Sequence, residues 1–205
     1  MAYFPLFIDL STKKCLVVGG GRVALSKIEK LLMFEAGITV VAPEIDEKLR
    51  TLGIQVLERE FTAEDIDDRD LVIAATDNRE LNATIADLCR EARIPINVVD
   101  DPELCSFIFP SLIRHGELSI GISSGGTSPS AVIDMKERIH EVLPLPNQPD
   151  TYGEILRQLG SLRETVKQTI ADPTKRAVCF KQLYIKSLEV ERPLTQEEIT
   201  EIVSR

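Results

Sequence analysis

A glycine-rich turn places the strongest constraint on how this chain can fold. Residues 15–18 are apolar, three glycines follow at residues 19–21, and apolar residues then recur at helical spacing. A strand, a tight turn and a helix start have this signature. Gly19, Gly21 and Ala24 fit the G-x-G-x-x-G/A fingerprint, in which free N–H groups at the helix start bind a dinucleotide pyrophosphate. The alternative is a bare turn, but the flanking strand and helix favour the dinucleotide interpretation.

The rest of the chain continues the pattern that this turn begins. Short apolar runs alternate with amphipathic stretches, and the runs lie at residues 38–42, 54–57, 71–77 and 95–99. This alternation predicts an α/β fold with a Rossmann-like, doubly wound parallel sheet. Two later runs, residues 106–113 and 118–122, are too close in sequence for a helical crossover, so we expect an antiparallel hairpin. A helix over about residues 152–171 begins the C-terminal helical part.

A proline-rich segment at residues 143–149 is the best candidate for a domain boundary. We expect three parts: a dinucleotide-binding domain over residues 1–112, a hairpin region over residues 113–146 and a helical domain over residues 147–205. The chain of 205 residues is long enough for this division around a substantial core.

Charge and terminal sequence limit the partners that we expect. The formal net charge of −9 argues against a nucleic-acid backbone, whereas an anionic small molecule responds only to local charge. No apolar run approaches membrane-spanning length, and the N-terminus lacks the basic and apolar regions of a signal peptide. The cysteines are scattered, which is typical of reduced thiols in the cytoplasm. We therefore expect a cytoplasmic protein without a nucleic-acid or membrane partner.

Polar residues at the ends of predicted strands are candidates for ligand binding. Thr76 and Asp77 end one such strand, where open α/β sheets bind their ligands. Glu44 lies close to the position from which an acidic residue binds the adenosine ribose, an arrangement that favours NAD over NADP. A solvated glutamate at a helix start is the alternative, with Pro43 shaping the wall of the adenine pocket.

A carboxylate is the expected acid–base group, because both histidines fall in patterns typical of surface or packing residues. Asp100 and Asp101 follow the strand at residues 95–99. Neighbouring side chains at a strand end point in different directions, so at most one should face a ligand. Such a carboxylate could accept a proton from a substrate, or the pair could instead cap backbone N–H groups in a turn.

A second loop rich in glycine and hydroxyl groups spans residues 123–129, before a predicted helix. Ser128 should cap this helix, and Pro129 suits its first turn. The N–H groups and hydroxyls of the loop could hold a carboxylate, or they could form only a capped turn.

These segments, in this order, resemble precorrin-2 dehydrogenase, the dehydrogenase module of siroheme synthase. The resemblance is dense over roughly residues 1–145 and rests on the stretches at residues 4–7, 17–27, 74–77, 97–100, 106–110 and 123–129. No methyltransferase module follows in this sequence, so we expect the stand-alone form of the family. The resemblance implies NAD-dependent oxidation of precorrin-2 to sirohydrochlorin by a homodimer, with residues 113–146 as the dimerisation region.

The resemblance also implies roles for individual residues. Asp100 matches the catalytic aspartate of the family, and no residue is assigned to a metal. The implied cofactor contacts are Gly19, Gly21, Arg22, Val23, Pro43, Glu44, Thr76 and Asp77. The implied substrate contacts are Asn97, Ser124, Gly125 and Thr127. Arg22 departs from family members with an acidic residue there, which leaves the detail of the phosphate contact open.

Two other functions are compatible with these residues. A bifunctional enzyme would also insert ferrous iron into sirohydrochlorin, and the sequence does not separate it from a dehydrogenase. A non-catalytic NAD-sensing module would keep the glycine fingerprint but would need neither Asp100 nor the loop around Ser124.

Overall fold

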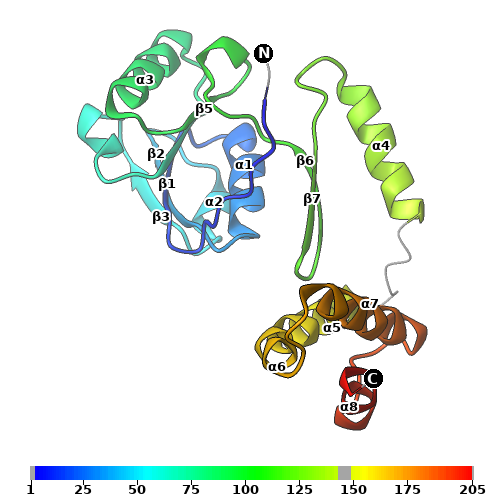
Figure 1. Cartoon of the computed structure of the whole chain (residues 1–205). Coiled ribbons are helices and arrows are strands. Elements are labelled where there is room, and N and C mark those ends of the chain that lie inside the picture. Colours follow the sequence, from blue (N-terminus) through cyan, green and yellow to red (C-terminus); the bar gives the residue numbers. More distant parts are fainter. Residues whose placement is uncertain (1–2, 143–148, 205) are drawn as a thin grey trace. The chain divides into compact units, whose positions relative to one another are not determined.

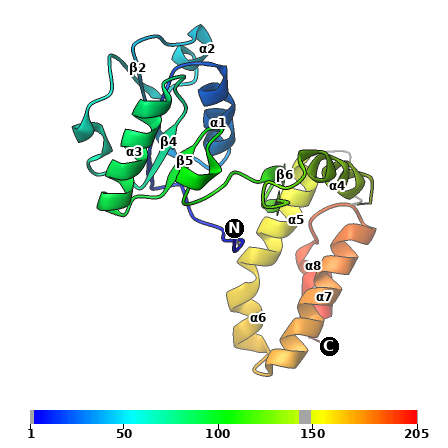
Figure 2. The ribbon, with the colours of Figure 1, turned by 90° about the horizontal axis from the view of Figure 1, so that it is seen from above.

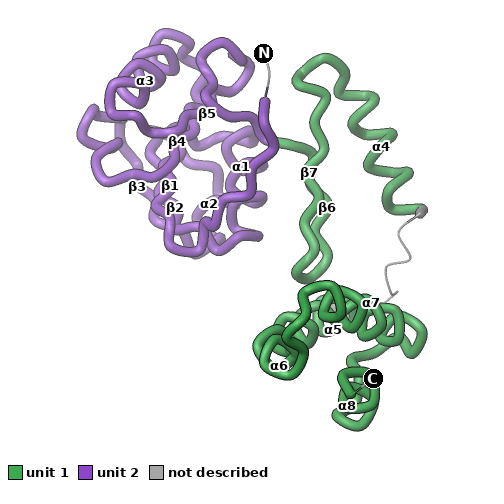
Figure 3. Tube along the Cα trace, in the orientation of Figure 1, with its two compact units in different colours: residues 1, 110–205 green, residues 2–109 purple. Residues whose placement is uncertain are grey.

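The computed structural model describes residues 3–142 and 149–204. The chain divides into two compact units, shown in Figure 3: residues 2–109, which we call the sheet unit, and residues 110–205 together with residue 1, which we call the hairpin–helix unit. The expected boundary at residues 143–149 lies outside the described residues except for Pro149. The three-part division therefore stays a prediction.

The sheet unit contains the parallel sheet that the sequence predicts. Its strands are β1 (Lys14–Val18), β2 (Gly37–Ala42), β3 (Gln55–Glu58), β4 (Leu71–Ala74) and β5 (Ile96–Val98). Its helices are α1 (Arg22–Leu32), α2 (Glu47–Arg50) and α3 (Arg79–Ala92), with short 3-10 helices η1 (Ala63–Ile66) and η2 (Pro102–Leu104). The strand order is β3-β2-β1-β4-β5, and every neighbouring pair is parallel. This confirms the Rossmann-like fold.

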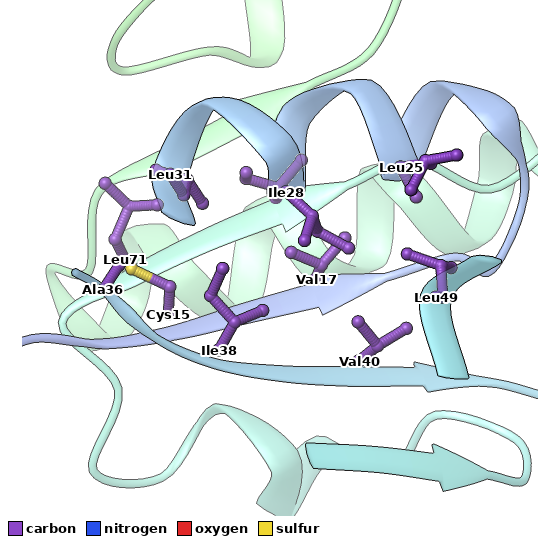
Figure 4. Close-up of a cluster of buried hydrophobic side chains, with 12 residues drawn as sticks. Cys15, Val17, Leu25, Ile28, Leu31, Ala36, Ile38, Val40, Leu49 and Leu71 are labelled. Atoms are coloured by element: carbon purple, nitrogen blue, oxygen red, sulfur yellow. The ribbon is translucent and has the colours of Figure 1, made fainter. Parts of the chain in front are cut away.

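Helices cover both faces of this sheet, which explains why its strands are apolar at successive positions. Along β1, Cys15 and Val17 belong to the core under α1 and α2, whereas Leu16 and Val18 belong to the core under α3. Figures 1 and 2 show α1 and α3 on opposite faces. Figure 4 shows apolar side chains of α1, among them Ile28, directed at the strands. The two cores hold the carboxyl ends of the strands in fixed register.

The hairpin–helix unit begins with the predicted hairpin. Strands β6 (Ser111–His115) and β7 (Leu118–Ile122) pair antiparallel, and Gly116 takes the positive φ of 56° that a two-residue turn requires. The helices that follow are α4 (Pro129–Val142), α5 (Pro149–Ser161), α6 (Arg163–Thr169), α7 (Pro173–Glu189) and α8 (Gln196–Val203). The helix predicted over residues 152–171 is α5 and α6, interrupted at Leu162, although hydrogen bonds from Leu162 N to Gln158 O and from Val166 N to Leu162 O continue across the break. None of the described helices is both long and apolar enough to cross a membrane.

A close backbone contact joins the hairpin turn to α5. A Cβ atom on Gly116 would lie 2.5 Å from Gly153 Cα, so Gly116 has no room for a larger residue, and a Cβ on Gly153 would lie only 3.1 Å from Gly116 Cα. Beside this contact, the His115 ring packs edge-on to Tyr152, and the Tyr152 hydroxyl hydrogen-bonds the Tyr184 hydroxyl of α7 at 3.0 Å. Burial and this hydrogen bond raise the pKa of Tyr152 to about 12. The hairpin and the helices α5 and α7 are therefore packed together.

Helix α8 is held by polar groups at its first turn. Thr195 and Glu198 form a capping box, and the Glu198 carboxylate also accepts two hydrogen bonds from Arg192, each 3.0 Å long. Ile199 then packs into the apolar core that α6 and α7 form with Val166 and Leu183. The cap positions the apolar face of α8 against this core.

Glu198→Gln should weaken α8 at neutral pH and remove a pH dependence of its stability. Hydrogen bonds from Arg192 and from the Thr195 backbone lower the pKa of Glu198 from 4.5 to about 2. Because the folded pKa is the lower one, the ionised carboxylate stabilises α8 above pH 4.5, and this stabilisation is lost as the pH falls toward 2. Hydrogen-exchange protection of the α8 amides measures the effect. Glu197→Gln, in the same turn, is the control, and an equal response of both variants would contradict the assignment.

Candidate functional site

A cavity of about 720 Å³ lies at the carboxyl ends of β1, β2 and β4. The order of the sheet reverses direction between β1 and β4, because α1 and α3 lead the chain away on opposite faces, and open α/β sheets bind ligands at such a point. The cavity is lined by all the residues predicted to contact a cofactor: Gly19, Gly21, Arg22, Val23, Pro43, Glu44, Thr76 and Asp77. The structure thus brings them together, and their individual roles remain predictions.

The three glycines of the turn meet different physical demands. Gly19 has a φ of 122°, and a Cβ there would collide with the Ala75 carbonyl oxygen. A Cβ on Gly20 would collide in the same way with the Glu44 carbonyl oxygen. Gly21 differs, because a Cβ there would meet no atom within 4 Å. The first two glycines therefore permit close backbone packing, whereas Gly21 leaves space open at the cavity.

The start of α1 is suited to a pyrophosphate. Gly21 is the N-cap and supplies no side-chain hydrogen bond, and the first turn contains no acidic residue. The first N–H groups of a helix have no partner within the helix, and they form the positive end of its dipole. Arg22 is exposed and adds a positive charge, while Ala24 is fully buried where the helix approaches the sheet. Gly21 and the helix start therefore form a cradle that fits phosphate groups.

The acidic side of the cavity follows β2. The Gly20 carbonyl accepts a 2.8 Å hydrogen bond from Asp46 N, which holds the segment after β2 against the glycine turn. Asp46 also caps α2 by accepting a hydrogen bond from Lys48 N at 2.9 Å. The exposed Glu44 carboxylate forms no hydrogen bond or ion pair with any described residue, so it is available to a ligand.

Asn82, which the sequence analysis did not single out, fixes the loop after β4. Its Oδ1 accepts a 2.7 Å hydrogen bond from Thr76 Oγ1, and its Nδ2 donates a 2.9 Å bond to Thr76 O. Asn82 is only 6% exposed on α3. An amide at a buried position of an amphipathic helix was the signal that could have identified it, because buried polar groups need partners.

A second cavity, of about 460 Å³, adjoins the first along the same edge of the sheet. The residues that line both cavities are Val23, Ala75, Thr76 and Asp77. The second cavity extends to the end of β5, where Asp100 and Asp101 lie. A ligand bound in the first cavity and one bound in the second would therefore meet at the shared wall.

Both aspartates line the second cavity, and the expectation that at most one of them faces a ligand stays a prediction. Side chains alternate only in an extended strand, whereas Asp100 has left that conformation, with a φ of 60°. Asp100 is exposed, and Asp101 is held by an ion pair with Arg79 at 3.3 Å. The two carboxylates consequently differ in their freedom to act on a ligand.

The predicted substrate residues do not all lie at this edge. Asn97 is buried within β5 and lines neither of the two cavities; its Nδ2 donates to Phe107 O at 3.1 Å, and its buried Oδ1 has no partner among the described residues. Ser124, Gly125 and Thr127 belong to the hairpin–helix unit. There Ser124 Oγ accepts from Ser128 N at 3.0 Å, and Ser128 Oγ accepts from Ala131 N, which confirms the predicted helix cap. The role of this loop toward a substrate stays a prediction.

Comparisons with known proteins agree with this geometry. A family model described as putative NAD(P)-binding matches residues 6–111. A siroheme synthase of Thioalkalivibrio sulfidiphilus is 39% identical over 200 residues, which cover 96% of this chain and 39% of that protein. A siroheme synthase of Tolumonas auensis is 42% identical over 178 residues, which cover 86% of this chain and 37% of that protein. The chain thus spans about two fifths of the length of these relatives.

A solved structure shares the fold over nearly the whole chain. The structure of SirC, precorrin-2 dehydrogenase, superposes with a TM-score of 0.63 at 20% identity and covers 98% of each chain. Together with the siroheme synthases, it confirms the resemblance stated from the sequence motifs. Because the family model matches more than half of the residues, the chain belongs to the family described as putative NAD(P)-binding.

Proposed function

We propose that this protein is an NAD-dependent dehydrogenase that oxidises precorrin-2 to sirohydrochlorin. The observation that carries the proposal is the wall shared by the two cavities, because one cavity suits a dinucleotide and the other contains Asp100. An acid–base carboxylate then lies beside the reactive end of a dinucleotide. The names of the relatives, siroheme synthase and precorrin-2 dehydrogenase, support the choice of substrate.

The chain's own residues would hold the cofactor along the first cavity. The cradle at Gly21 would hold the pyrophosphate, and the Arg22 guanidinium would stand close to it. The free Glu44 carboxylate would accept hydrogen bonds from a ribose diol and would repel a ribose phosphate, which favours NAD over NADP. The Thr76–Asp77 loop, fixed by Asn82, would support the end of the dinucleotide that reaches the shared wall.

Oxidation of precorrin-2 removes one hydrogen as a hydride and another as a proton. When bound, the nicotinamide ring supplies the acceptor for the hydride. Asp100 would accept the proton, since its exposed carboxylate lines the second cavity. Asp101 would instead hold Arg79, with which it forms an ion pair. Asn97, which is buried in β5, would lie beneath the bound substrate. The loop with Ser124, Gly125 and Thr127 would bind substrate carboxylates.

We also propose that the protein is a homodimer through its hairpin–helix unit. A two-stranded sheet is marginally stable by itself, and within residues 3–142 and 149–204 β6 and β7 pair only with each other. On α4, Ile133 and Met135 are 57% and 49% exposed. A second copy that covers these apolar groups would stabilise both elements.

The direct test is to incubate the purified protein with precorrin-2 and NAD and to follow the absorbance of sirohydrochlorin and of NADH together. The proposal requires that both products form in equal amounts. Binding of NAD without turnover would favour a non-catalytic NAD-sensing module instead.

Gly21→Asp should abolish NAD binding and leave the fold intact. The new side chain enters open space, so nothing in the protein must move, but its volume and negative charge occupy the place proposed for the pyrophosphate. Calorimetric titration with NAD measures the loss. Gly160→Asp is the matched control, because a Cβ there also meets no atom within 4 Å and Gly160 lies in α5. Wild-type affinity in a folded Gly21→Asp variant would rule out the site.

Asp100→Asn should lower turnover of precorrin-2 by about 10²–10⁴-fold and leave NAD affinity nearly unchanged. Asparagine is a suitable replacement because it tolerates the positive φ of 60° at this position, whereas alanine would add backbone strain. Asp101→Asn is the control and should change turnover little, since that carboxylate pairs with Arg79. Small and equal losses in the two variants, measured at saturating NAD, would mean that neither aspartate is the acid–base group.

Ile133→Glu should convert the dimer to a monomer, because it places a charge in the apolar face proposed to meet the second copy. Light scattering coupled to size exclusion measures the mass. Val178→Glu is the control, since Val178 is 53% exposed on α7. A dimeric Ile133→Glu variant would place the interface elsewhere.

A further inference from the structure

Lys27 has a position that none of the roles above explains. It lies on α1 one turn after Val23, which lines both cavities, and residues four apart in a helix share a face. Its ammonium group lies 4.5 Å from the centre of the Phe109 ring. Phe109 in turn packs against Phe107, with ring centres 5.6 Å apart.

The Lys27 ammonium is half-buried and has no carboxylate partner among the described residues. It forms no hydrogen bond or ion pair with another residue in the part of the chain that the structure describes, and its contact is the Phe109 ring. Burial and the charge of Lys30 lower the pKa of Lys27, against the opposing effects of Cys105 and Asp100. A half-buried charge without a counterion is less well solvated than an exposed one, so an anionic ligand that pairs with it is favoured.

A second unsatisfied polar group lies on the same face of the sheet. Asn97 is in register with Ile73, which belongs to the core under α1. Its Nδ2 is bound to the carbonyl of Phe107, and its Oδ1 is buried without a partner in the described part of the chain. The segment with Phe107 and Phe109 thus contacts both Asn97 and Lys27. The Asn97 Oδ1 and the Lys27 ammonium group both lack a polar partner among the described residues.

We propose that Lys27 is a substrate-binding residue that pairs with a carboxylate of the tetrapyrrole. This inference rests on the proposed function. The charged residues that line the second cavity are Asp77, Asp100, Asp101 and Arg79, so Lys27, one turn after Val23, would add a cation at its border. The Phe109 ring holds the ammonium group in place, so little side-chain freedom is lost when the carboxylate binds. Lys27 and Asp100 then act on the same substrate: one binds an acidic side chain, and the other receives the proton.

The test uses the chain of 205 residues and uroporphyrin, a stable porphyrin with the same acetate and propionate groups as the substrate. Lys27→Met keeps the apolar stem that packs on Phe109 and removes the charge. We expect the affinity for uroporphyrin, followed by fluorescence, to fall about tenfold, with a weaker dependence on salt, while NAD affinity and thermal stability stay unchanged. Lys27→Arg should restore most of the affinity.

Lys30→Met is the matched control, because it removes the same charge from the same helix at a position without the ring contact. Equal losses in the Lys27→Met and Lys30→Met variants would overturn the proposal, since they would reflect only the general charge of α1. Wild-type affinity in Lys27→Met would overturn it as well. Binding of uroporphyrin that depends on Lys27, in a protein that does not oxidise precorrin-2, would support this site and contradict the proposed reaction.

Discussion

The sheet unit depends on close backbone contact at the glycine turn. Gly19 lies against the end of β4 at Ala75, and Gly20 lies against the segment after β2 at Glu44. Hydrogen bonds from Gly19 N to Val41 O and from Asp46 N to Gly20 O hold these segments at 2.9 and 2.8 Å. The ends of three strands are thereby drawn together around one turn. The cavity exists because the next glycine, Gly21, leaves this packed region and faces open space.

Much of the fold could be predicted from the sequence because its signals are local. Continuous apolar runs identify strands buried on both faces, and the glycine turn and the short hairpin link identify the connections. The break at Leu162 was not predicted, because hydrogen bonds continue across it and no proline or glycine marks the residue itself. The contact between Gly116 and Gly153 was also beyond prediction, since it joins positions far apart in the chain.

The site residues that lie at the ends of strands could be predicted from the sequence. Glu44 follows β2 and Thr76 follows β4, yet both line the same cavity because parallel strands end at one edge of the sheet. The different surroundings of the two neighbouring aspartates could not be predicted: Arg79 forms an ion pair with Asp101, whereas Asp100 is exposed. The same is true of Asn82, whose importance comes from its bonds to Thr76 rather than from its place in a motif. Side-chain contacts of this kind depend on the assembled structure.

The left-handed backbone at Asp100 has a consequence for how this protein would respond to selection. Aspartate and asparagine tolerate a φ of 60° better than other residues with a side chain, but glycine adopts it without steric cost, so Asp100→Gly would relieve a strain of at most about 1 kcal/mol. A library screened only for resistance to heat should therefore enrich Asp100→Gly, whereas the acid–base role proposed for Asp100 requires that a screen for activity eliminate it. At this one position, selection for stability and selection for activity would favour different residues.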